Sequence, residues 1–383
     1  MYEKCRELLS LYTLIFRHAY RWRSAHLFLC HELFCQSSWE NPIWPERFPV
    51  LQHLTVHIIG DRDACINSRP SMKILSAPLL QTFSHTGHGI EVVSSKSPSK
   101  QSGPLGSLRS LSFSDHLYES NLSLASSMTS VILRRICNFS YSDRSAVICH
   151  AEEVSLLPEV VGSWSGWEIK STLSYMTLPN VTSLALEALV SEELYANTWV
   201  TSPEISFHTE LVSLLNRSSA TLITHFTIID IRMKDEELLL VLVQLPSLSH
   251  LALGDSIMVQ ENIEPAMLSA LLFSSLSFPI YIDYSSTIYN PRLVELHVGF
   301  GNALSFGSHQ CNTFLEMINS RSIDLKLPFR LKHVRIKMLA THKDNDIANA
   351  LLDLPESRMV VELDWAVSRL EWRSGLGHWQ LEG

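Results

Sequence analysis

A short apolar phrase recurs along this chain of 383 residues and limits what the chain can fold into. It runs proline, any residue, leucine, two residues, leucine, one residue and leucine, with other apolar residues in some copies. Each copy has the length of a short β-strand with one apolar edge, and a lone strand cannot bury that edge. The copies must therefore stack on one another. The clearest are Pro49-Leu51-Leu54-Val56, Pro179-Val181-Leu184-Leu186, Pro246-Leu248-Leu251-Leu253 and Pro291-Leu293-Leu296-Val298. Looser copies are Pro78-Leu80-Phe83, Leu108-Leu111-Phe113, Ile223-Phe226-Ile228, Leu331-Val334-Ile336 and Val360-Leu363-Trp365.

The spacing of the copies predicts one strand and one helix per repeat. Leu51 and Leu80 are 29 residues apart, and Leu80 and Leu108 are 28 apart. Repeats of this length stack so that each contacts only its neighbours. We therefore predict an α/β fold, a leucine-rich-repeat-like right-handed β/α solenoid with a curved parallel sheet and helices on its convex side. Adjacent parallel strands are expected at 51–56, 181–186, 248–253, 293–298 and 331–336.

The predicted solenoid covers residues 48–365. Residues 1–47 are expected to hold a helical cap and a first irregular repeat, and residues 366–383 a C-terminal cap. A mobile insertion is expected near 94–104, where Ser, Lys, Pro and Gly show no periodicity. Intervals of 73 residues after Leu108 and 45 after Leu248 contain either degenerate repeats or insertions. The apolar face of the cap helix, at 7–19, is expected to comprise Leu8, Leu11, Tyr12, Ile15 and Ala19.

Helices are expected shortly before several strand copies, at 207–215, 313–320 and 346–354. Another begins near Asp235, a residue type that caps helix N-termini, and ends before Pro246. Its apolar stripe is expected to comprise Leu238, Leu239, Leu242 and Val243.

Composition excludes several classes of protein. The net charge of -9, with 39 acidic and 30 basic residues, lacks the basic excess of a nucleic-acid-binding protein. The sequence contains no apolar run long enough for a membrane span, and the N-terminal region does not resemble a signal peptide. Seven cysteines, an odd number, indicate free thiols in a reducing compartment. We expect a soluble cytoplasmic or nuclear protein that binds neither nucleic acid nor membrane.

No motif predicts catalysis, a cofactor or a metal. His31-Glu32 is followed by Cys35 where a metalloprotease helix needs a second histidine. Trp164 occupies the position of the serine in a nucleophile elbow, between Gly162 and Gly166. We predict that the chain is not an enzyme, and we expect no catalytic residues, no cofactor and no metal ligands.

One pattern of polar residues remains. Histidine directly precedes the second apolar position of four copies, at His53, His225, His250 and His333. Because strand side chains alternate between faces, these histidines are expected to form a row opposite the leucines, on the concave face where solenoids bind partners. Two interpretations remain open: a tolerated polar residue, or a shared binding site. Other residues predicted for this partner-binding face are Thr227, Glu295, His297 and Arg335.

The chain also resembles the F-box and leucine-rich-repeat-like proteins of mushroom-forming fungi. The resemblance rests on residues 17–24, 48–51, 211–226, 235–253, 314–321 and 331–334. It implies a non-catalytic scaffold that holds a protein substrate for a cullin ubiquitin ligase. The resemblance begins at the helix that normally follows the F-box, so a Skp-type adaptor is an expected partner only if an F-box is encoded upstream. The alternative is a standalone repeat protein or truncated paralogue without a ligase connection.

Overall fold

The structure is a computed structural model in which the strands form a twelve-stranded, all-parallel open sheet. The strand order is β1-β2-β4-β6-β7-β9-β12-β14-β15-β16-β17-β18, which fits the predicted leucine-rich-repeat-like solenoid. The described residues are 10–30, 48–59, 71–72, 77–87, 91–92, 107–117, 128–139, 147–157, 159–160, 167–190, 207–231, 233–255, 268–277, 290, 292–300, 308–322, 330–339 and 359–366.

The chain forms two compact units, which are described in turn. The first comprises residues 1–157 and 175–179. Its strands in the main sheet are β1 (Ser24–Cys30), β2 (His53–Ile59), β4 (Thr82–Gly87), β6 (Ser110–Leu117), β7 (Ser130–Phe139) and β9 (Glu153–Leu157). Shorter elements are the 3-10 helix η1 (Ala19–Arg21) and the paired strands β3 (Ser71–Met72) with β5 (Glu91–Val92) and β8 (Val147–Ile148) with β11 (Met176–Thr177).

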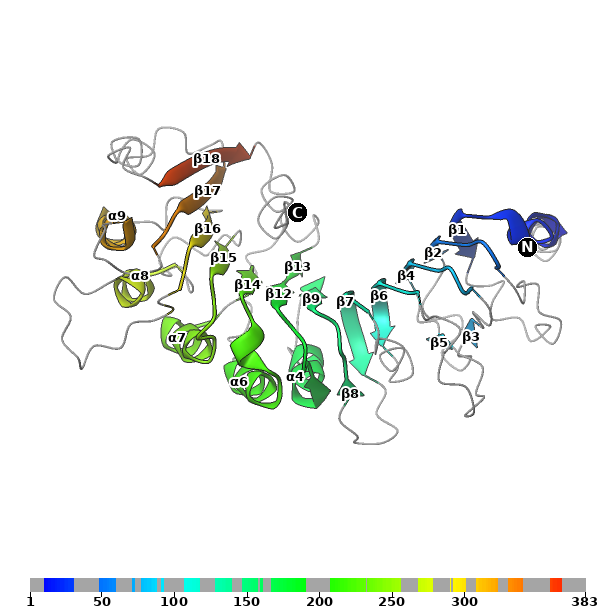
Figure 1. Cartoon of the computed structure of the whole chain (residues 1–383), viewed down its shortest axis with the longest axis horizontal. Coiled ribbons are helices and arrows are strands. Elements are labelled where there is room, and N and C mark those ends of the chain that lie inside the picture. Colours follow the sequence, from blue (N-terminus) through cyan, green and yellow to red (C-terminus); the bar gives the residue numbers. More distant parts are fainter. Residues whose placement is uncertain are drawn as a thin grey trace. The chain divides into compact units, whose positions relative to one another are not determined.

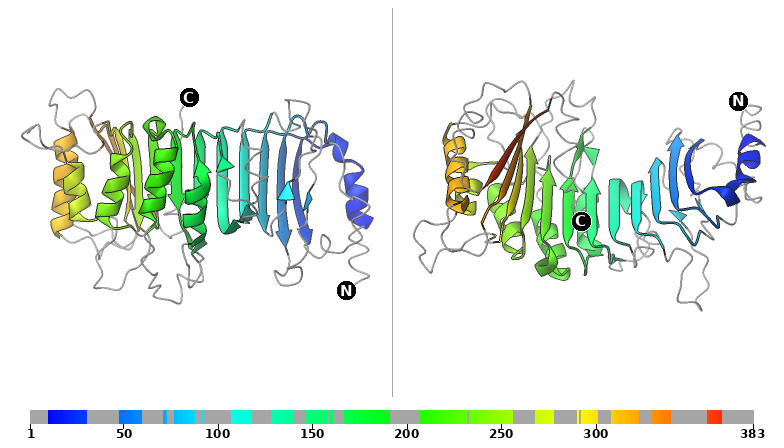
Figure 2. Two further views of the ribbon diagram at one scale, coloured as in Figure 1. Left: turned by 90° about the horizontal axis from the view of Figure 1, so that it is seen from below. Right: turned by 45° about the horizontal axis from the view of Figure 1, so that its top comes forward.

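The second unit comprises residues 158–174 and 180–383 and alternates strands with helices. Helices α6 to α9 lie side by side along one side of its strands (Figures 1 and 2). The strands are β12 (Ser183–Glu187), β14 (His225–Ile229), β15 (His250–Asp255), β16 (Glu295–Phe300), β17 (His333–Leu339) and β18 (Val360–Ala366). The helices are α4 (Trp167–Tyr175, whose last residue belongs to the first unit), α6 (His208–Arg217), η4 (Ala220–Leu222), α7 (Asp235–Val243), α8 (Ala270–Leu276) and α9 (Ser308–Ser322). Strands β10 (Glu159–Val160) and β13 (Leu189–Val190) pair separately.

The strands begin two residues later than the phrase predicted. The first leucine of a copy closes a turn: the Leu248 N–H donates to Leu245 O (3.1 Å), and the Leu293 N–H donates to Asn290 O (3.1 Å). Both leucines are buried, so the phrase contains the turn that precedes the strand as well as the strand.

A repeated hydrogen-bond pattern sets the start of most strands of the main sheet. One carbonyl oxygen accepts two consecutive N–H groups of the next strand's first residues, which its two lone pairs allow. The same pattern occurs in the first unit, where Gln52 and His53 donate to Arg23 O at 2.7 and 3.1 Å. Each strand therefore starts in register with its neighbour. In the second unit the N–H groups of Ser249 and His250 donate to Thr224 O, those of Val294 and Glu295 to Ser249 O, and those of Lys332 and His333 to Val294 O.

The turn before β16 is further fixed by two buried polar side chains. Asn290, in the left-handed region at φ 46°, donates to the carbonyl oxygens of Leu242 (3.0 Å) and Leu245 (3.1 Å) at the end of α7. Arg321 donates to the carbonyls of Leu276 and Asn290, and burial lowers the pKa of its guanidinium to about 10. These contacts satisfy carbonyls at the ends of two helices.

The two long intervals have different contents. Between Leu108 and Val181 two further strands, β7 and β9, join the sheet, so degenerate repeats lie there. Between β15 and β16 no strand lies among the described residues, and the two strands pair directly with each other. In the first unit the described residues between β2 and β4, 71–72 and 77–81, form the short strand β3 and a turn, and the helix that the repeat length predicts is not found among them. The expected insertion at 94–104, the helix at 346–354 and the tail at 367–383 lie outside the described residues.

Two predicted helix details are wrong. Asp235 is the first residue of α7, and the N-cap is Lys234, whose N–H donates to Glu237 Oε2 (3.1 Å). Val243 is exposed, while Val241 lies buried in its place.

The N-terminal helix, described at 10–16, also turns a different face inward. Leu11 and Ile15 are exposed, and Phe16 is buried against Trp22 with 5.8 Å between ring centroids. This aromatic contact fixes how the helix is rotated. No helix among the described residues is both long and apolar enough to cross a membrane.

A substitution at Leu251 tests which face of the strands packs into the core, because this side chain is fully buried as predicted. We expect Leu251→Ala to lower the free energy of unfolding by about 2 to 5 kcal/mol, since it leaves a cavity in a packed core. Leu240→Ala on α7 is the matched control: the side chain is 54% exposed, and a loss within about 0.5 kcal/mol is expected. Equal losses in denaturant titrations of the two variants would contradict the assigned faces.

Candidate functional site

In the second unit the strands place polar side chains on the face opposite the helices. Leu251, Leu296 and Val334 are fully buried, and the residues just before them point to the other face because strand side chains alternate. The register pairs His225 with His250, His250 with Glu295, and Glu295 with His333. Three of the four predicted histidines thus form a row with Glu295 among them.

The first two histidines of the row stack on one another. The rings of His225 and His250 are 4.0 Å apart between centroids and inclined by 12°. Each ring also contacts the hydroxyl of the preceding residue: Thr224 Oγ1 lies 2.8 Å from His225 Nδ1, and Ser249 Oγ lies 2.7 Å from His250 Nδ1. These contacts orient both rings along the row.

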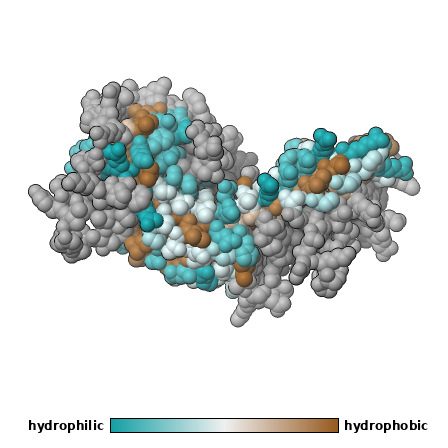
Figure 3. All heavy atoms as spheres, in the orientation of Figure 1, coloured by the Kyte–Doolittle hydropathy of each residue, from teal (hydrophilic) through white to brown (hydrophobic). Residues whose placement is uncertain are grey.

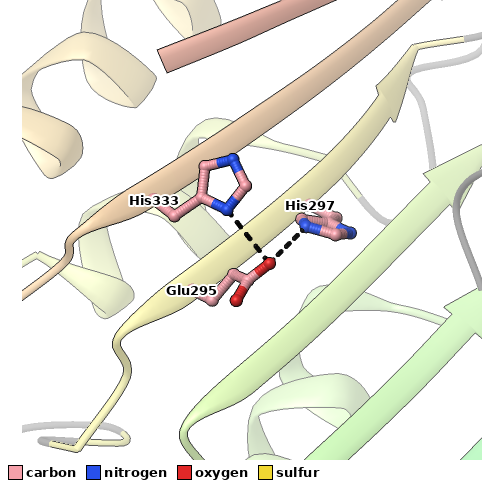
Figure 4. Close-up of side chains that lie close together, drawn as sticks. All are labelled: Glu295, His297 and His333. Carbon is pink, nitrogen blue, oxygen red and sulfur yellow. Dashed lines mark hydrogen bonds and ion pairs between the residues drawn. The ribbon is translucent and has the colours of Figure 1, made fainter. Parts of the chain in front are cut away.

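Glu295 is the centre of the site. Its Oε1 lies 2.8 Å from His297 Nε2 and 3.1 Å from His333 Nδ1, while its Oε2 lies 3.4 Å from His250 Nε2. Figure 4 shows the carboxylate of Glu295 between the rings of His297 and His333. One carboxylate therefore contacts three imidazoles from strands β15, β16 and β17.

The network continues through charged residues onto β18. His333 Nε2 lies 3.4 Å from Glu362 Oε2, and Arg335 contacts both Glu362 (3.7 Å) and Asp364 (3.6 Å). Lys337 Nζ lies 3.6 Å from Asp364 Oδ2. We use the name polar strip for His225, His250, Glu295, His297, His333, Arg335, Lys337, Glu362 and Asp364.

The electrostatics of the strip keep His225 and His250 in a different charge state from the central carboxylate of Glu295. Burial, reinforced by the neighbouring His250, lowers the pKa of His225 to about 4, despite the opposing influence of Glu295. Burial also lowers the pKa of His250, although Glu295 acts in the opposite direction. The hydrogen bond from His297 is the main cause of the lowered pKa of Glu295. At neutral pH, Glu295 is ionised, and His225 and His250 are uncharged.

The sequence-predicted residues divide between the two units. Thr227, His297 and Arg335 share the face of the histidine row, and Thr227 and His297 are buried. His53 belongs to β2 in the first unit, where its Nδ1 contacts Thr82 Oγ1 (2.9 Å). Among the described residues, the ion pairs of the strip also include Glu362 and Asp364, which the prediction did not name. The Val360-Leu363-Trp365 copy contained the signal, because alternation from Leu363 places both acids on the histidine face.

The visible face of the second unit shows hydrophilic and apolar residues interspersed in small areas over the described part of the chain (Figure 3).

A scan against models of known protein families finds no match to this chain, and a search of curated proteins finds no similar sequence.

The stack of His225 on His250 predicts a dependence of stability on pH. The folded pKa of His225, about 4, lies below its ordinary value of 6.5, so between these values the unfolded chain binds a proton that the folded chain does not. Its contribution to stability is present above pH 6.5 and is lost as the pH falls towards 4. The titratable groups that act on His225 are His250 and Glu295. We expect His225→Asn to lose less stability than the unmodified chain between pH 7 and pH 5.

Urea titrations at the two pH values measure this difference. The exposed His53→Asn, the same substitution on a strand of the first unit, is the control and is expected to follow the unmodified chain. An unchanged pH dependence in His225→Asn would show that the stacked ring does not resist protonation.

Proposed function

We propose that this chain is a non-catalytic protein-interaction scaffold that binds its partner on the polar strip. The observation that supports this most is the continuous network from His225 to Asp364, which spans five strands of one unit. Side chains on a parallel sheet are held by the backbone, so little conformational entropy is lost when a partner binds them. A peptide or protein surface is the partner class that fits so extended a set of polar groups.

The exposure of the strip indicates which residues a partner contacts first. The side chains of Glu362 and Asp364 are 49% and 40% exposed, and Arg335 is 32% exposed, whereas His297 is only 5% exposed. Exposed acids accept hydrogen bonds from lysine or arginine, so we propose a partner that presents basic side chains to β18. The less exposed histidines and Glu295 then act as the support beneath that contact.

A structural role explains a contact beside the strip that has the residue types of a catalytic pair. Ser249 Oγ lies beside His250, but it also donates to Thr224 O (3.1 Å). Thr224 repeats this arrangement one strand earlier, with its hydroxyl bonded to Thr182 O (3.3 Å) and beside His225. Because the same contacts recur at two successive strand starts, they are better explained by orientation of the rings than by activation of a nucleophile.

The resemblance to F-box and leucine-rich-repeat-like proteins supports a more specific role, the recognition of a substrate for a cullin ubiquitin ligase. This role would place the chain in the cytoplasm or nucleus, and its seven cysteines suit such a reducing compartment.

We expect a Skp-type adaptor to co-purify only when an F-box is fused ahead of residue 1. Co-purification of the adaptor with the unfused chain would contradict this. Failure of both forms to bind it would favour the standalone scaffold or truncated paralogue.

The test of the partner surface compares two sets of exposed charges. In the first variant Arg335, Glu362 and Asp364 are replaced by alanine, and in the control Glu236 and Glu316, exposed on the helix side, are replaced by alanine. For a partner identified by affinity purification, we expect the first variant to lower affinity at least tenfold, because close charge pairs across an interface can couple by about 1.5 kcal/mol or more, and about 1.4 kcal/mol is a factor of ten. The control is expected to bind as the unmodified chain does.

Binding measurements on purified proteins, with folding checked by circular dichroism, give the affinities. A partner that binds the strip variant normally and loses affinity for the helix-side variant would move the interface to the helices.

A further inference from the structure

We propose that Glu295, His297 and His333 form a binding site for a divalent transition-metal ion, and that Zn²⁺ is the ion it suits best. Two imidazoles and one carboxylate are a ligand set found in zinc proteins, and they leave one position open for water. The potential ligand atoms of the three residues all lie within 4.8 Å of one another. The proposal does not depend on a protein partner.

The distances are close to those that a zinc ion requires. With bonds of about 2.0 to 2.1 Å and tetrahedral geometry, ligand atoms lie roughly 3.3 Å apart. Glu295 Oε1 is 2.8 Å from His297 Nε2 and 3.1 Å from His333 Nδ1. The third pair of ligand atoms, the nitrogens of His297 and His333, lies within 4.8 Å, so side-chain rotations must draw these two rings together around an ion. Figure 4 shows a nitrogen of each ring facing the carboxylate of Glu295.

The backbone holds the three residues in place. Glu295 and His297 are two residues apart on β16, so both point to the same face, and His333 is the direct partner of Glu295 on β17. The register that sets this pairing comes from the carbonyl of Val294, which accepts the N–H groups of Lys332 and His333. A site on paired strands loses little freedom when an ion binds.

A second layer of contacts has the form usual around metal ligands. A metal-bound histidine normally donates its other N–H to a carboxylate, and bound carboxylates are themselves hydrogen-bonded. His333 presents Nδ1 to the site and places Nε2 3.4 Å from Glu362 Oε2. Glu295 presents Oε1 to the site, and its Oε2 lies 3.4 Å from His250 Nε2. Both contacts are ion-pair distances, and small side-chain rotations would shorten them to the outer hydrogen bonds that a metal site uses.

The surroundings are compatible with a cation. Arg335 is the nearest basic residue along β17, and its charge is matched by ion pairs with Glu362 and Asp364. The side chains of Glu295 and His333 are 23% and 29% exposed, so an ion can reach them from solvent.

The test uses the full chain without an affinity tag, stripped with a chelator and titrated with ZnCl₂ by calorimetry. We expect one ion to bind per chain, and we expect this binding to be lost in Glu295→Gln and His333→Ala. His225→Asn, in the same row but outside the ligand set, is the control and is expected to bind normally. The ligand variants are needed to assign the bound ion to this site, because the chain has 17 histidines and 7 cysteines in all, and those outside the site can also bind zinc.

A milder substitution covers the case in which a ligand variant does not fold. Glu362→Gln changes an exposed residue outside the ligand set, and we expect it to weaken zinc binding by about 10- to 100-fold, as loss of an outer partner of a ligand does. Co²⁺ bound in place of zinc should show visible bands of nitrogen and oxygen ligation without thiolate charge transfer. Absence of binding to the unmodified chain, unchanged binding in the folded variants, or thiolate bands would overturn the proposal.

Discussion

The hydrogen bonds at the start of each strand are the constraint on which the rest of the structure depends. One carbonyl accepts two N–H groups from the following repeat. A carbonyl at the start of that repeat accepts two N–H groups from the repeat after it in the same way. Because this contact recurs in both units, the copies that have it enter the sheet at corresponding positions. Apart from one register shift between β6 and β7, parallel neighbours therefore match residue for residue, as His250, Glu295 and His333 do. The polar strip is a consequence of this register: similar positions in successive copies must lie side by side.

Much of the fold could be predicted from the sequence, because the apolar phrase combines a turn signal with a strand signal. Two copies of the phrase that the prediction did not include differ from the others at their first apolar position. Met128-Val131-Leu133 and Ala151-Val154-Leu156 have the same spacing as the others, and all six residues are buried. Methionine and alanine occupy the place of the first leucine there, so a pattern that requires leucine at this position does not predict strands β7 and β9.

The row of histidines was predictable, but the network around Glu295 was not. Alternation places residues on a face, whereas a contact between side chains depends on register and rotamer, which no single copy of the phrase contains. His297 is two residues beyond Glu295, and only the pairing of β16 with β17 brings His333 to the same carboxylate. The buried Asn290 and Arg321, which fix the preceding turn, gave no local signal because their partners lie 31 to 48 residues away.

A half-buried carboxylate among three imidazoles is a costly way to fill a sheet face, since desolvation opposes its ionisation. Groups with shifted pKa values cluster at functional sites, and structural ion-pair networks shift pKa values as well.

The most direct test of the claim that register brings Glu295 to His333 is a double-mutant cycle on the free energy of unfolding. Glu295→Gln, His333→Asn and the double variant are compared with the unmodified chain in urea titrations, in buffer free of metal ions. Side chains in direct contact couple by about 0.5 to 3 kcal/mol, and this range is the result we predict. A second cycle on His225 and His333, three strands apart and roughly 14 Å across the sheet, should be additive within about 0.5 kcal/mol. Additivity in the first cycle would contradict the alignment of the strands from which the site is built.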